Sequence, residues 1–218
     1  MSLLIDVHTD VKQFLDNNKE LYFNERDFQM HLATYLHQTG HYEDVDVEYY
    51  VPQSELENYI WNNELRIDVL VSKGGEYLPI ELKYKTKSVK KRIPRFGERL
   101  SLNVEVMKNQ GAQDLGKYDF WNDVRRIEII RKRFKTVKNG LAIFMTNDPT
   151  YLQNGRMSSN HVNFSMTEGT HHKEKHWLDK ESICSKTHPD FDVDTDYSVH
   201  WETRTIEDIN IYYTILTI

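Results

Sequence analysis

The sequence has few of the features that mark disulfide-stabilised, secreted or membrane proteins. Cys184 is the single cysteine among 218 residues, so an internal disulfide is impossible, and we expect a reducing, cytoplasmic compartment. The longest clean apolar run covers residues 141–145, far short of the ~20 residues of a membrane-spanning helix. The N-terminal stretch lacks the basic segment of a secretory signal and reaches Asp6 after three apolar residues. We therefore expect no membrane association.

Low complexity, repeats and bulk positive charge are absent too. A composition of 39% apolar and 12% aromatic residues is too rich for a disordered chain. The length fits a single domain, 1–218, with a sizeable core. The formal charge of −6 excludes a polycation that binds nucleic acid through bulk charge alone, but it leaves a local basic surface open.

Hydrophobic periodicity predicts an α/β or α+β fold. The second of the predicted helices follows Asn24, a good N-cap residue. The expected elements are helices near 7–18 and 25–38, strands at 45–51, 65–72 and 77–85, one or two helices within 100–136, and an apolar strand at 141–145. Residues 151–218 are expected to form loops and short strands with a β-rich end at 210–218.

Two adjacent glycines predict a tight hairpin between the strands at 65–72 and 77–85. Gly74 and Gly75 both accept the positive φ that a two-residue turn needs. The resulting register places Asp68 opposite Glu81, and like charges in that position destabilise a sheet. A divalent cation such as Mg²⁺ would neutralise them, and Lys83 on the same face could hold a phosphate or orient a metal-bound water. The alternative is a solvated polar face.

Glu25 is a third carboxylate with an informative position. It lies on the same stripe of the helix 25–38 as Phe28 and Leu32, at the N-terminal edge. A carboxylate aimed toward the core needs a partner. Favourable interaction with the helix N-terminus is the alternative explanation.

The order helix, strand, strand with Asp, strand with Glu-x-Lys, helix, strand resembles the core of the PD-(D/E)XK nuclease superfamily, which has the restriction-endonuclease-like fold. The resemblance covers about 20–150 and is carried by four residues and one further strand: Glu25 in NERDFQMHLATYL, Asp68 in LRIDVLV, Glu81 and Lys83 in LPIELKYK, and the segment GLAIFMTND. Ile67 stands where the motif often has proline. The fold implied is a central mixed β-sheet flanked by helices, with 151–218 as a C-terminal β-rich extension of the same domain.

The resemblance also implies an activity: Mg²⁺- or Mn²⁺-dependent endonucleolytic hydrolysis of phosphodiester bonds, with DNA as the expected substrate. Asp68, Glu81 and the backbone carbonyl of Leu82 would ligate the metal, Lys83 would steer or activate the attacking water, and Glu25 would complete the outer metal shell. The setting would be restriction, defence or a mobile element, and double-strand cleavage would favour a homodimer. The alternative is a non-catalytic nucleic-acid-binding or partner-binding module on the same fold.

A basic segment follows the Glu-x-Lys strand, at 83–99. Such a segment beside a metal site suits a polyanion, although a solvated loop that balances nearby acids is the alternative. The candidate nucleic-acid-binding residues are Lys85, Lys87, Lys90, Lys91, Arg92 and Arg95, with Gln113 as an additional candidate. A later basic group that includes Arg125 and Arg126 is expected on the solvent face of its helix.

Three clustered histidines offer a rival site for a zinc-dependent hydrolase. His172 and His176 have the i, i+4 spacing that could hold zinc on a helix, with His171 beside them. The segment contains no H-E-x-x-H motif and no nearby cysteine, so surface histidines are the favoured interpretation.

Overall fold

The computed structural model describes residues 2–153 and 155–218, and it has an α+β fold built on a mixed six-stranded sheet. The strands lie in the order β1-β2-β3-β8-β14-β13, and β3 and β8 are parallel while the other neighbours are antiparallel. Their bounds are Asp44–Val51, Leu65–Lys73, Glu76–Lys85, Leu141–Thr146, Ile209–Thr217 and Glu202–Ile206, in that same order. The predicted α+β class with a central mixed sheet is confirmed.

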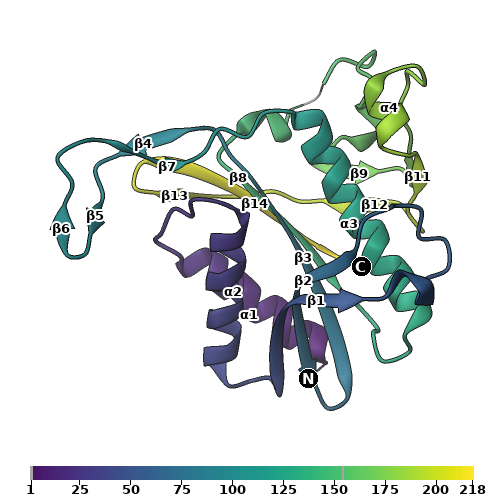
Figure 1. Cartoon of the computed structure of the whole chain (residues 1–218), viewed down its shortest axis with the longest axis horizontal. Coiled ribbons are helices and arrows are strands. Elements are labelled where there is room, and N and C mark those ends of the chain that lie inside the picture. Colours follow the sequence, from purple (N-terminus) through teal and green to yellow (C-terminus); the bar gives the residue numbers. More distant parts are fainter. Residues whose placement is uncertain (1, 154) are drawn as a thin grey trace.

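Helices cover the two faces of the sheet (Figure 1). α1 (Leu3–Asn17) and α2 (Glu25–Thr39) pack on one face, against residues that include Ile80, Leu82 and Ile143. α3 (Gln113–Arg133) packs on the other face, against the alternate residues Ala142 and Phe144. The period-2 alternation of strand side chains thus divides the core into two layers. Asn24 caps α2 as predicted, because its side chain accepts from the Asp27 N–H at 2.9 Å.

The β2–β3 hairpin has the register predicted from its glycines. Gly74 and Gly75 adopt φ values of 62° and 75°, and the ladder runs from the pair Lys73 and Glu76 to the pair Val69 and Ile80. No further residue pair of this ladder is formed within the described chain, so Asp68 and Glu81 lie just beyond its end.

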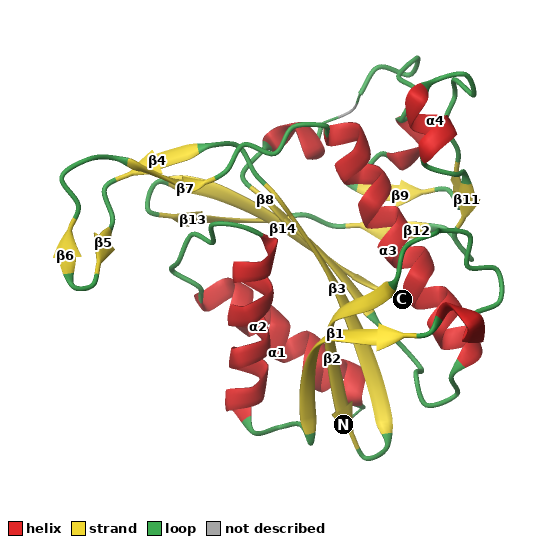
Figure 2. Ribbon diagram, viewed as in Figure 1, coloured by secondary structure: helices red, strands yellow, loops and turns green. Residues whose placement is uncertain are grey.

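Residues 88–107 form a projecting hairpin, which we call the arm (Figure 2). β4 (Val89–Lys91) pairs with β7 (Val104–Met107) at its base, and β5 (Pro94–Arg95) pairs with β6 (Glu98–Arg99) at its tip. The predicted helix from about 100 is therefore wrong over 100–112. Val104 and Val106 alternate with polar residues as in a strand, and the helix begins only at Gln113.

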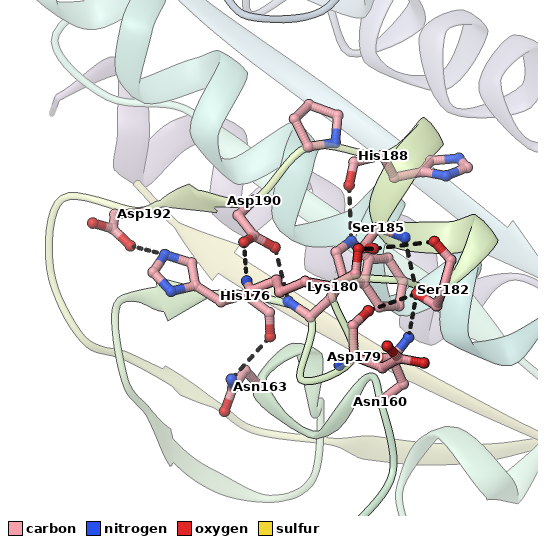
Figure 3. Close-up of polar contacts among 12 residues, drawn as sticks. Asn160, Asn163, His176, Asp179, Lys180, Ser182, Ser185, His188, Asp190 and Asp192 are labelled. Atoms are coloured by element: carbon pink, nitrogen blue, oxygen red, sulfur yellow. Dashed lines mark hydrogen bonds and ion pairs between the residues drawn. The ribbon is translucent and has the colours of Figure 1, made fainter.

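The region between β8 and β13 has little regular structure and is held by side-chain hydrogen bonds (Figure 3). Asn160 donates to Ser182 Oγ at 2.9 Å and accepts from the Asp179 N–H at 2.6 Å, while Asp190 accepts from the Trp177 N–H at 2.8 Å. Its elements are η2 (Pro149–Tyr151), η3 (Val162–Phe164), β9 (Gly169–His171), β10 (Glu174–Lys175), α4 (Ile183–Thr187), β11 (Phe191–Asp192) and β12 (Tyr197–Val199), and η1 (Gln53–Glu55) lies earlier in the chain. The chain then returns to the central sheet through β13 and β14.

Candidate functional site

The four residues predicted as catalytic gather where β2 parts from β3. The Leu82 N–H donates to Asp68 Oδ2 at 2.7 Å, and the Tyr84 N–H donates to Glu25 Oε2 at 2.8 Å. Two carboxylates therefore take the amide groups of β3 that β2 would otherwise have paired. Buried backbone donors need such partners, which explains why both side chains are fixed at this point.

A glutamine of α2 strengthens this junction. The side chain of Gln29 donates from Nε2 to the Asp68 carbonyl at 2.6 Å and to Glu48 Oε1 at 3.1 Å, and the residue is buried. Glu48 has a positive φ of 54° and is the one residue of β1 that drops out of the ladder with β2. No local sequence pattern indicates this contact, because it depends on how α2 crosses the sheet.

Glu81 and Lys83 point to the opposite helix, α3, and meet two partners that sequence reasoning missed. Lys83 Nζ lies 2.7 Å from Asp123 Oδ2 and 4.0 Å from Glu25 Oε1. Arg126 lies 3.6 Å from Glu81 and 3.1 Å from Asp123. Arg126 was expected on the solvent face and is not there, since its side chain is only 11% exposed. The available signal was the position of Asp123 among buried residues of α3, beside Val124.

These contacts belong to a longer line of opposite charges, which we call the charged seam; it runs between β3 and α3 and continues into the segments that follow β3 and β8. Beyond Glu81–Arg126 and Lys83–Asp123, Lys85 pairs with Asp119 at 3.5 Å and Lys87 pairs with Asp148 at 2.9 Å. Gln113 joins the far end by donating to Asp148 Oδ2 at 3.2 Å. Three residues that were predicted to contact nucleic acid thus have partners within the seam: Lys85, Lys87 and Gln113.

Burial sets the electrostatics of the site. It raises the pKa of Asp68 to about 6, and it raises the pKa of Glu81 well above its usual value, with Asp123 and Asp68 adding to the effect. Burial alone would lower the pKa of Lys83, but the surrounding carboxylates, Asp123 foremost, hold it well above its usual value. Lys83 is therefore a stable cation at neutral pH.

The donor set at the site has the chemistry that Mg²⁺ prefers, since carboxylate and carbonyl oxygens are hard ligands. Glu81 Oε1 is buried and has no hydrogen-bond partner among the described residues. The Leu82 carbonyl accepts from Lys83 Nζ at 3.1 Å. Within the described chain, no three or more His, Cys, Asp or Glu residues are grouped as a metal site. The oxygen donors fit the ion, and ligation by the Leu82 carbonyl would displace the Lys83 contact.

The remaining predicted basic contacts lie on the arm. Lys91 Nζ lies 3.3 Å from Glu207 Oε2, in the turn between β13 and β14. Lys90, Arg92 and Arg95 are exposed and form no ion pair within residues 2–153 and 155–218. The basic segment therefore consists of a paired part in the seam and a part on the arm in which, among the described residues, Lys91 is paired and Lys90, Arg92 and Arg95 are not.

The three histidines do not form a shared site. His172 pairs with Asp196 at 3.2 Å and His176 with Asp192 at 2.9 Å, while His171 Nε2 lies 2.7 Å from the Thr167 carbonyl. Strands β9 and β10 replace the helix that an i, i+4 zinc pair would need.

No family model, curated protein or solved structure matches the chain. No helix in the described residues is long and apolar enough to cross a membrane.

Proposed function

We propose that the chain is a metal-dependent nuclease of the PD-(D/E)XK type that hydrolyses phosphodiester bonds in DNA. The observation that carries the proposal is the convergence of Glu25, Asp68, Glu81 and Lys83 from α2, β2 and β3 at one junction. Asp68 and Glu25 are fixed by neighbouring amides of the same strand, so the cluster is built into the sheet.

The order of elements around this junction supports a restriction-endonuclease-like core. α2 precedes an antiparallel meander of β1, β2 and β3, and α3 then leads to β8, which pairs with β3 in parallel. Glu25 lies on α2, Asp68 on β2, and Glu81 and Lys83 on β3.

The roles follow from the chemistry of the side chains. Mg²⁺ or Mn²⁺ would be held by Asp68, Glu81 and the Leu82 carbonyl, and it would lower the pKa of a bound water and stabilise charge on the phosphate. Lys83 carries its proton firmly, so it stabilises negative charge on the phosphate and orients water rather than accepting a proton from it. Glu25 holds Lys83 and the Tyr84 amide in place.

A second candidate function is a non-catalytic nucleic-acid-binding module. It is favoured by the pairing of Lys83 with Asp123 and of Glu81 with Arg126, because both predicted site residues already have partners of opposite charge.

Cleavage of single- and double-stranded DNA with Mg²⁺, Mn²⁺ or EDTA separates the two functions. We expect metal-dependent cleavage that falls at least about 100-fold in Asp68→Asn and Glu81→Gln, each of which removes one charged ligand. The exposed Glu57→Gln is the matched control and should cleave normally. Binding without cleavage by the native chain would favour the second function, and cleavage that survives both substitutions would contradict the proposed site.

A further inference from the structure

The tip of the arm has a turn that is unusual for its sequence. Phe96 and Gly97 connect β5 to β6 with φ values of 52° and 82°. Two-residue hairpin turns with positive φ at both positions favour Asn, Asp or Gly at the first one. A bulky aromatic residue is unfavourable in this left-handed region. Turn formation therefore does not account for the phenylalanine.

Packing does not account for it either. The Phe96 side chain is fully exposed, with a relative accessibility of 104%. Ile93 and Leu100 are only partly exposed, whereas Leu102, further back along the arm, is 73% exposed. Phe96 thus lies in the turn between β5 and β6, the strands at the tip of the projecting hairpin (Figure 2).

The charge around Phe96 is positive and unpaired. The arm holds five cations against two acids, namely Lys90, Lys91, Arg92, Arg95 and Arg99 against Glu98 and Glu105. Apart from Lys91, these cations form no ion pair with any residue that the structure describes. Arg95 lies on β5 and Arg99 on β6, so each of the two strands that Phe96 connects carries one arginine.

We propose that the arm binds DNA and that Phe96 stacks on an unpaired base. The preferred substrate is then single-stranded DNA or a duplex that is locally opened. This inference rests on the proposed nuclease function. Arginines along a narrow element suit the spaced phosphates of a strand, and an aromatic face suits a base. Unpaired bases offer that face freely, whereas an intact duplex must first be unstacked.

A lipid surface is the competing partner, and the arm fits it less well. Insertion into a bilayer interface needs a broad apolar face. The arm offers one fully exposed aromatic side chain at its tip and one exposed leucine, Leu102, further back among cations. Charge along both strands with a single ring at the end matches a nucleic acid strand better.

The test measures binding of the full chain in EDTA to a single strand that contains 2-aminopurine, to the matched duplex, and to anionic phosphatidylserine vesicles. Phe96→Ala should weaken single-strand binding about tenfold and remove the change in 2-aminopurine fluorescence. Phe96→Trp should restore both, and the duplex affinity of Phe96→Ala should change less than twofold. Ile183→Ala, an exposed apolar control on α4, should behave as the native chain.

The outcomes separate this inference from the proposed nuclease function. Native single-strand affinity in Phe96→Ala overturns the inference while leaving Asp68-dependent cleavage intact. Phe96-dependent binding without any metal-dependent cleavage supports the stacking role of Phe96 and overturns the nuclease function. Binding to vesicles that depends on Phe96, or no nucleic acid binding at all, overturns the stacking role.

Discussion

The charged seam and the arm draw on one continuous basic stretch of sequence, yet they use their charges in opposite ways. In the seam, Lys83, Lys85 and Lys87 each lie within 4 Å of an acid from α3 or the end of β8. On the arm, Arg92, Arg95 and Arg99 are exposed and have no such partner among the described residues. The first group stabilises the fold around a candidate active site, and the second is free to meet a polyanion.

The largest expected effect concerns the buried centre of the seam. Asp123→Ala should lower the free energy of unfolding by about 3–5 kcal/mol. Its carboxylate pairs with both Lys83 and Arg126, and the substitution would leave these two buried cations without that partner. Urea unfolding measures the change. Arg95→Ala on the arm is the control and should change stability by less than ~0.5 kcal/mol. Equal effects at both positions would contradict the comparison.

Lys175 sharpens the comparison because it is a buried cation outside the seam. It is fully buried, lies 3.9 Å from the centre of the Trp121 ring and forms no ion pair within the described chain. Burial lowers its pKa to about 8. The folded state then binds this proton more weakly than the unfolded state, so stability should rise as pH increases from about 8 to 10.

Lys175→Met isolates this effect. The variant should be more stable than the native chain by about 2–3 kcal/mol at pH 7, with the difference shrinking as pH approaches 10. Urea unfolding at three pH values gives the difference, and other titrations cancel between the two proteins. A pH-independent difference would show that the amine keeps its proton in the fold, through its contact with Trp121 and the hydrogen bond that it donates to the His172 carbonyl.

The next prediction concerns salt dependence of DNA binding. Replacing Arg92, Arg95 and Arg99 together by alanine should reduce the slope of log K against log salt concentration for single-stranded DNA by roughly 2 units, if each arginine contacts one phosphate. The double variant Lys85→Ala and Lys87→Ala should reduce it by less than about 1 unit, since those charges are already paired. Titrations at several salt concentrations compare them, and the reverse ranking would contradict the division between seam and arm.

The smallest effect lies at the outer end of the seam. The Lys87 side chain is 49% exposed, although its partner Asp148 is buried. Lys87→Met should cost at most about 1 kcal/mol of stability, as expected for a pair partly in water. Its thermal unfolding should then resemble that of the arm variants more than that of Asp123→Ala.

Residues with a strong local preference for a turn or a helix cap made part of the fold and of the candidate site predictable. Gly74 and Gly75 fix a turn, and the turn fixes the β2–β3 register. Asn24 marks the start of α2 and so the place of Glu25. The partners Asp123 and Arg126 were missed because they depend on the rotation and crossing of α3, which hydrophobic periodicity does not specify.

The strands of the arm, and the pairing of the expected β-rich end 210–218 with β8, were not predicted for a different reason. Residues 104–107 form a four-residue strand inside a stretch that was assigned to helix, and so short a segment has little periodic signal. The pairing of β14 with β8 joins residues about 70 positions apart in sequence, which no local pattern reports. Prediction therefore succeeded at the turn, the cap and the four residues of the family motif, and it failed for the partners on α3 and for the strand pairings that no motif marks.

Metal binding tests the central claim most directly, because it needs no substrate. Calorimetric titration of Mn²⁺ into the native chain should show binding that is lost in Asp68→Asn and in Glu81→Gln and retained in Glu57→Gln. Equal binding by all four proteins, or none by the native chain, would contradict a metal site at the junction of β2 and β3.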